Sequence, residues 1–172
     1  MKSCIVVAGK SEIRRCRAHR VTLAISMVLL LLLSGCALLS LVEGREAVSA
    51  DAFADIARRQ SFTVEQPTDA TTLLGATDVR EATKGSIEVF FAVMPDAADA
   101  ERAFASLRSD IDQYWTGSGS QRDVNTPSFN HRSINTANLS FVVIRVDNTI
   151  FYGESTRDYR DEMSALVEAM GY

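Results

Sequence analysis

The segment LSFVVIRVDNTIFYGE, residues 139–154, has two β-prone runs on either side of Asp147-Asn148. A two-residue link between apolar runs is typical of a β-hairpin, and an Asp-Asn pair can adopt the left-handed backbone geometry of a type I′ turn. Residues 141–144 are all apolar, which predicts a strand that is covered on both faces. The segment therefore predicts an antiparallel hairpin at the centre of a sheet.

A second hairpin is predicted upstream. Residues 79–83 and 87–94 are β-prone and are separated by Lys84-Gly85-Ser86, where the glycine can supply the positive φ of a tight turn. A β-prone trio at 62–64 and a further strand near 129–135 would add to the same sheet. These strands should pair antiparallel.

Three helices are predicted around the strands. The first begins after a Ser49 N-cap and continues to about Gln60, and the second opens at Pro95-Asp96 and continues to Tyr114. The third follows a cap at Ser155 or Thr156 and ends at Gly171. Between the second helix and the strand near 129, the polar stretch TGSGSQRDVNTPS, residues 116–128, predicts a loop.

Antiparallel strands with about three helices predict an α+β fold of two layers, with a mostly antiparallel sheet on one side and the helices on the other. A ferredoxin-like arrangement is one version of this architecture. Residues 49–172 form a single predicted domain, which is long enough to bury a core.

Charge and cysteine content differ sharply along the chain. Residues 1–35 hold six basic residues and one acidic residue, a net of +5, so with −4 overall the remainder carries −9. A domain this acidic is repelled by nucleic-acid phosphates and by anionic lipid surfaces, so both are disfavoured as partners and no nucleic acid is expected to bind. All three cysteines lie within the first 36 residues, so the domain offers neither a disulfide framework nor a thiolate metal site.

The first 35 residues have the three parts of a secretory signal peptide: a basic region to Arg20, an apolar run over 21–33, and small residues at Ser34 and Gly35. Leu33-Ser34-Gly35-Cys36 resembles the lipobox of bacterial lipoproteins. The resemblance implies cleavage between Gly35 and Cys36 and a lipid on the Cys36 thiol. Residues 36–48 would then be lipid anchor and tether, and the domain would face outside the cytoplasm of a bacterial cell, held at the membrane.

An uncleaved membrane span is the alternative anchor. Residues 21–42 contain no charge, and at ~1.5 Å per residue they reach roughly 33 Å, which is enough to cross a bilayer. The basic residues before the span would stay in the cytoplasm, so the domain faces outward in both cases.

Residues 49–172 also resemble a group of small bacterial lipoproteins of uncharacterised function. The similarity lies in RVDNTIFY (145–152), in SIEVFFAV (86–93) with the alanine-rich helix after it, and in EAMGY (168–172). It implies an anchored α+β domain and transfers no active site.

Few residues of the domain are candidates for chemistry. His131 is the only histidine after residue 35, and Glu88 and Glu154 could be paired carboxylates, although strand alternation also lets each face water. Tyr114 and Trp115 stand at the base of the 116–128 loop and form a candidate binding rim. No catalytic, cofactor-binding or metal-ligating set is predicted.

Two functions follow from these features. The first is a noncatalytic module that binds an unknown envelope protein or ligand, favoured because no convergent polar set is visible. The second is a small envelope hydrolase that would use His131 with a serine and a carboxylate.

Overall fold

The computed structural model describes residues 45–67 and 75–172. The predicted signal peptide 1–35, the cleavage and lipid sites at Gly35 and Cys36, and the alternative span 21–42 lie outside the described residues. The elements are α2 (Ala50–Arg59), β1 (Thr63–Glu65), β2 (Asp78–Lys84), β3 (Ile87–Val93), α4 (Ala97–Asp112), β4 (Ser120–Asn125), β5 (Phe129–Asn135), β6 (Leu139–Val146), β7 (Thr149–Thr156), the 3₁₀ turn η1 (Arg157–Tyr159) and α5 (Arg160–Ala169).

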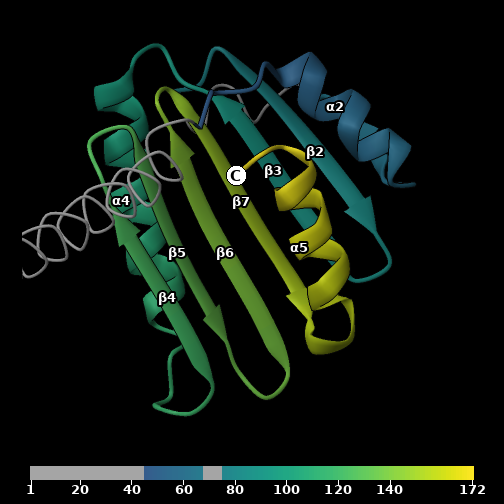
Figure 1. Ribbon diagram of the computed structural model, residues 1–172, viewed down its shortest axis with the longest axis vertical. Coiled ribbons are helices and arrows are strands. Elements are labelled where there is room, and N and C mark those ends of the chain that lie inside the picture. The colour runs from purple at the N-terminus through teal and green to yellow at the C-terminus, as the bar shows by residue number, and fades with distance from the viewer. Residues whose placement is uncertain (1–44, 68–74) are drawn as a thin grey trace, which may run out of the picture. The chain divides into compact units, whose positions relative to one another are not determined.

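The strands form one antiparallel sheet in the order β1-β2-β3-β7-β6-β5-β4 (Figure 1). It consists of two meanders, β1 to β3 and β4 to β7, joined by α4 and meeting where β3 pairs with β7. The α+β class, the antiparallel sheet and the three helices are confirmed. The fold differs from the βαββαβ pattern of a ferredoxin-like fold. Within each half of the chain, strands that are consecutive in sequence are also neighbours in the sheet.

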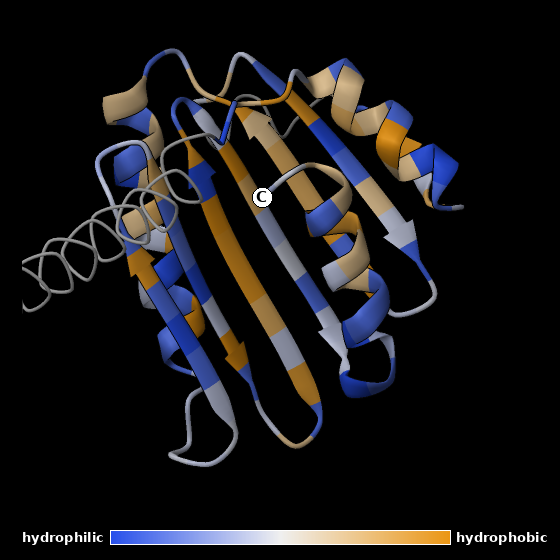
Figure 2. Ribbon diagram, in the orientation of Figure 1, coloured by the Kyte–Doolittle hydropathy of each residue, from blue (hydrophilic) through white to orange (hydrophobic). Residues whose placement is uncertain are grey.

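Helices cover both faces of the sheet rather than the one face expected from sequence. On one face Phe53 of α2 stacks on Phe91 of β3, with ring centroids 4.7 Å apart, and Leu166 of α5 joins the same core. On the opposite face α4 packs Ala100 and Phe104 against the sheet. The central strands supply apolar residues to both cores, and this is why β6 is hydrophobic along most of its length (Figure 2).

The predicted helix starts are right for two of the three helices. Ser49 caps α2 by accepting a hydrogen bond from the Ala52 N–H, and Asp96 caps α4 through the Asp99 N–H. Neither Ser155 nor Thr156 caps α5, because β7 continues to Thr156 and η1 intervenes. The Thr156 hydroxyl instead lies 2.6 Å from the Ser86 hydroxyl, linking β7 to the β2–β3 turn.

The predicted loop 116–128 is wrong, because residues 120–125 form the edge strand β4. β4 pairs with β5, and the Asp123 carboxylate accepts a 2.6 Å hydrogen bond from Arg108 of α4. Gly119 leads into the strand with a φ of +123°, and a Cβ there would lie 1.9 Å from the Asn135 carbonyl oxygen. Gly119 therefore serves a close backbone approach.

The hairpin at Asp147-Asn148 is confirmed, but its predicted turn type is wrong. Asp147 has a φ of +48°, whereas Asn148 is not among the residues with positive φ. A positive φ at the first central residue alone is the pattern of a type II′ turn. Asn148 is held in its conformation by Met94, whose backbone N–H donates to the Asn148 carbonyl and whose carbonyl accepts from the Asn148 side-chain amide.

Candidate functional site

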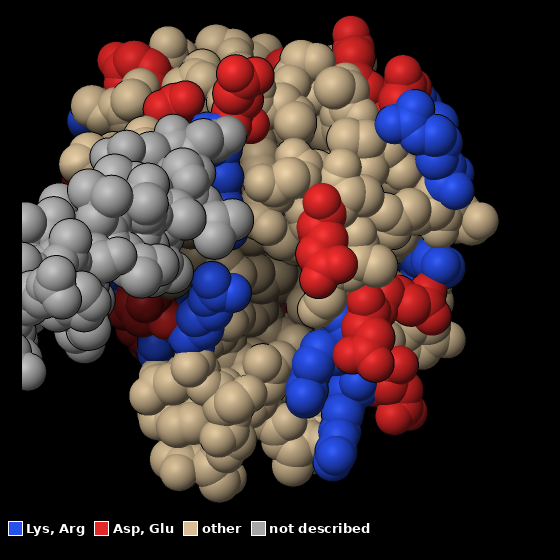
Figure 3. All heavy atoms as spheres, viewed as in Figure 1, with Lys and Arg blue, Asp and Glu red and all other residues tan. Residues whose placement is uncertain are grey.

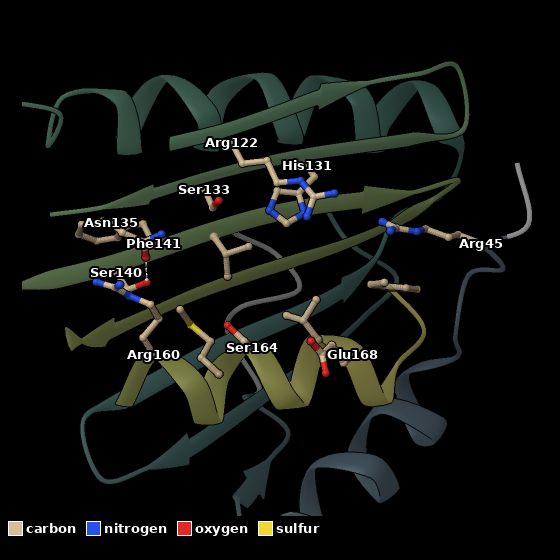
Figure 4. Close-up of a pocket in the computed structure, with 14 residues that line it drawn as sticks. Arg45, Arg122, His131, Ser133, Asn135, Ser140, Phe141, Arg160, Ser164 and Glu168 are labelled. Carbon is tan, nitrogen blue, oxygen red and sulfur yellow. Dashed lines mark hydrogen bonds between the residues drawn. The ribbon is translucent and has the colours of Figure 1, made fainter. Parts of the chain in front are cut away.

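A cavity of about 270 Å³ opens between α5 and strands β4, β5 and β6 (Figure 4). α5 packs over β7, so the outer part of this sheet face stays open beside it, and Figure 3 shows the surface hollowed there. Alternation along β5 directs His131, Ser133 and Asn135 to this side. The cavity is lined by Arg45, Arg122, His131, Ser133, Asn135, Ser140, Phe141, Val142, Arg160, Met163, Ser164, Val167, Glu168 and Tyr172.

The cavity is rich in cationic groups. The Arg45 guanidinium carbon lies 3.9 Å from the centroid of the Phe129 ring, a cation–π contact that holds the arginine against β5. Burial and, secondarily, the nearby positive charge of Arg122 lower the pKa of Arg45. None of the eight ion pairs found among residues 45–67 and 75–172 includes Arg45, Arg122 or Arg160.

His131 is a buried titratable group at the cavity, with 9% of its surface exposed. Burial, followed by the positive charges of Arg122 and Arg45, lowers the pKa of His131 to about 4. The imidazole is therefore neutral at pH 7. The imidazole packs edge-on against the Phe129 ring, with ring centroids 6.3 Å apart.

The residues required by the hydrolase alternative do not form a hydrogen-bonded set. Ser133, Ser140 and Ser164 line the same cavity as His131, but within the described parts of the chain no hydroxyl or carboxylate is hydrogen-bonded to the imidazole. Asp123 lies near enough to raise the pKa of His131, yet its carboxylate accepts from Arg108. Among the residues that the structure describes, no base is therefore oriented toward a hydroxyl as a serine nucleophile needs.

The predicted rim residues Tyr114 and Trp115 stand at the end of α4, away from this cavity. Tyr114 is 52% exposed and stacks on Phe141 with ring centroids 4.6 Å apart. Trp115 is half-buried and packs against the α4-side core. Their role in binding stays a prediction, now without the loop that suggested it.

Glu88 and Glu154 are brought side by side, directly opposite each other on β3 and β7. Both are half-buried, and burial together with the negative charges of Glu154 and Glu81 raises the pKa of Glu88. The Tyr152 hydroxyl donates a 2.9 Å hydrogen bond to Glu154. Over the described ranges, no group of three or more His, Cys, Asp or Glu residues has the arrangement of a metal site.

Two further hollows, of about 360 and 470 Å³, differ from the cavity in their charge pairing. Asp51 lines the smaller and binds Arg80 at 2.9 Å, and Arg108 lines the larger and binds Asp123 at 2.6 Å. Asp51 and Asp78 of the smaller hollow and Arg108 and Asp112 of the larger one are thus paired with neighbours, whereas Glu101 of the larger one is in none of the ion pairs found among the described residues. The α5 cavity differs because its arginines form no ion pair with any described residue.

Sequence reasoning did not single out Arg45, Arg122 or Arg160. Arg122 lay in a stretch interpreted as a loop, so no strand face was assigned to it. Alternation across β4 places Arg122 on the same face as Val124, and Val124 is the register partner of His131. If residues 120–125 had been recognised as a strand, this alternation would have placed Arg122 on the same side of the sheet as His131.

No helix in the part of the chain that the structure describes is long and apolar enough to cross a membrane. No family model matches the chain, and no curated protein matches it. Among the solved structures that are similar is one described as a GTP binding regulator from Thermotoga maritima, with 13% sequence identity and a TM-score of 0.43. The match covers 72% of this chain and 84% of the other.

Proposed function

We propose that this protein is a lipid-anchored, extracytoplasmic bacterial lipoprotein whose domain binds a ligand and is not an enzyme. The anchor rests on the signal-like segment that ends in Leu33-Ser34-Gly35-Cys36. Binding rests on one observation: polar side chains from α5, β4, β5 and the segment before α2 converge on one cavity, with no hydrogen-bonded nucleophile and base. Convergent polar groups in a partly apolar hollow are typical of ligand sites.

The anchor and the cavity are close along the chain. Arg45 follows Cys36 by nine positions, which span at most about 32 Å when fully extended. A lipid on Cys36 would therefore keep the cavity near the membrane surface. The ligand is expected to be a component of the envelope.

The anchor is tested by mass analysis of the membrane fraction. Wild-type chains should begin at Cys36 and carry the added mass of a diacylglyceryl group, and Cys36→Ser should abolish both cleavage and modification. Cys16→Ser is the matched control, because it removes a thiol from the same leader but not from the lipobox. Recovery of unmodified wild-type chains that retain residues 1–35 would instead favour the span over 21–42.

A further inference from the structure

We propose that the cavity between α5 and strands β4 to β6 binds an anionic group of the phosphate type, carried by a partly apolar molecule. Arg45 and Arg122 are its cationic partners, and His131 is a neutral hydrogen-bond donor to it. The inference rests on the proposed binding function and names the ligand class of that site.

The first step is the contrast between this cavity and the rest of the domain. The chain after residue 35 carries a net charge of −9, and elsewhere in the described domain most arginines are paired with carboxylates, among them Arg80, Arg108 and Arg132. Three arginines that form no ion pair with a described residue nevertheless line one cavity, where Glu168 is the single acidic side chain among the described lining residues. An excess of positive charge at one hollow of an acidic domain attracts an anion.

The second step is the proximity of like charges. Arg122 lies close enough to lower the pKa of Arg45, and both arginines lower the pKa of His131. The buried Nη1 of Arg45 has no hydrogen-bond partner among the described residues. Two planar guanidinium groups repel each other unless an anion lies between them, and each can hold two phosphate oxygens.

His131 provides the third step. Its imidazole is nine-tenths buried, lines the cavity, and makes no side-chain hydrogen bond to any residue in the described ranges. Because the imidazole lines the cavity, its ring N–H can donate a hydrogen bond to a ligand oxygen there, which would stabilise the complex. Figure 4 shows His131, Arg122 and Arg45 at the same end of the cavity.

The fourth step concerns the remainder of the ligand. Val142 of β6 and Met163 and Val167 of α5 supply apolar surface to the cavity. A volume of about 270 Å³ admits a small head group with a short apolar part, and not a polymer. A phosphate ester fits both the charged and the apolar walls.

Such a phosphate could be the head group of a membrane phospholipid or a free phosphate ester. Both share the chemistry that the cavity recognises, and the position of Arg45 near the predicted anchor makes the membrane reachable. The experiment therefore presents the two sources separately.

The test uses the mature lipidated chain in dodecyl maltoside micelles, which contain no phosphate, with phenyl phosphate as the free probe. Binding is measured by calorimetry and by the ring resonances of His131, the only histidine after residue 35. Wild type should bind phenyl phosphate, and binding should raise the pKa of His131 above its value of about 4, because the anion offsets the two arginines. Benzyl alcohol, which lacks the phosphate, should not bind.

Variants assign the site. Arg122→Gln should weaken phenyl phosphate binding by about tenfold or more. Arg45→Lys should weaken it less, because lysine keeps the positive charge and loses only the paired N–H donors of the guanidinium group. Arg59→Gln is the matched control: Arg59 is exposed on α2, outside the cavity, and should bind like wild type. Circular dichroism of each variant establishes that the fold is retained.

The second arm transfers the mature lipidated chain to phosphatidylglycerol nanodiscs without phenyl phosphate. A shift of the His131 resonances there, lost in Arg122→Gln, identifies the lipid head group as the source, whereas a response to phenyl phosphate alone identifies a soluble ester. Absence of both responses, or equal weakening by Arg59→Gln, would overturn the anion site. A response to benzyl alcohol without one to phenyl phosphate would also overturn it but leave the binding module standing, and a failure of Cys36 processing would overturn only the anchor.

Discussion

The phenolic oxygen of Tyr172 accepts a 3.0 Å hydrogen bond from the backbone N–H of Val48, 124 positions earlier in the chain. The same oxygen lies 3.2 Å from the Thr149 hydroxyl at the start of β7. Tyr172 is buried, so this contact joins the segment before α2, the central hairpin and the residues after α5 in a water-poor environment. It also closes the end of the core formed by α2 and α5.

Tyr172→Phe should lower the free energy of unfolding by about 1 to 2 kcal/mol, because it leaves a buried N–H and a hydroxyl without their partner. Urea denaturation at pH 7 measures the change. Tyr114→Phe is the control, since Tyr114 is half-exposed and should change stability by less than about 0.5 kcal/mol. Equal effects of the two substitutions would contradict this role of the Tyr172 hydroxyl.

The β6–β7 turn should tolerate glycine at its first central residue and not at its second. Asp147→Gly should be neutral or mildly stabilising because Asp147 has a positive φ, whereas Asp147→Val should cost about 1 to 2 kcal/mol. Asn148→Gly should cost about 1 kcal/mol, because it removes the 3.0 Å hydrogen bond to the Met94 carbonyl. Thermal denaturation ranks the three variants, and a stabilising Asn148→Gly would indicate a type I′ turn.

The stability of the domain should fall as the pH falls below about 6.5, in part through His131. The folded pKa of about 4 lies below the unfolded value of 6.5, so in this interval the unfolded chain binds the proton and the folded chain does not. The contribution of His131 to the free energy of unfolding is present above pH 6.5 and is lost by about pH 4. The difference between the folded and unfolded pKa of His131 corresponds to about 3 kcal/mol.

His131→Gln should therefore reduce the loss of stability between pH 7 and pH 4. Chemical denaturation at pH 7, 5.5 and 4 measures it for both proteins. An unchanged pH dependence in the variant would assign the acid sensitivity to other groups.

Glu88→Gln should stabilise the domain at pH 7. The raised pKa of Glu88 means that the folded state disfavours its charge, so the penalty is absent at low pH and appears as the pH rises through the folded pKa. Removing a like charge directly opposite Glu154 should stabilise by about 0.2 to 1 kcal/mol. The gain should vanish near pH 4, and Glu101→Gln, on an exposed face of α4, should show no such gain.

Elements with a local signal were predictable from the sequence. The apolar run 141–144 and its two-residue turn placed β6 and β7, and the caps Ser49 and Asp96 placed two helix starts. In each case the decisive contacts lie within a few residues of one another. Periodicity and capping report such contacts directly.

The edge strand β4 had no comparable signal. Only Val124 of its six residues is half-buried, and the others are exposed, so the sequence shows no alternation of apolar and polar positions. β4 is held as a strand by its pairing with β5 and by the hydrogen bond between Asp123 and Arg108, a residue fifteen positions earlier in the chain. A strand stabilised mainly by its neighbours cannot be recognised from its own residues.

By itself, the amino-acid sequence determined the central hairpin, the helical stripes and the antiparallel α+β class, because these follow from the order of side chains along a short stretch. Only the tertiary structure decided that helices cover both faces of the sheet and that Arg45, Arg122 and His131 meet at one cavity. Arg45 and Arg122 are 77 positions apart. They meet because β4 pairs with β5 in a register that sets Val124 opposite His131, and because Arg45 packs over the Phe129 ring.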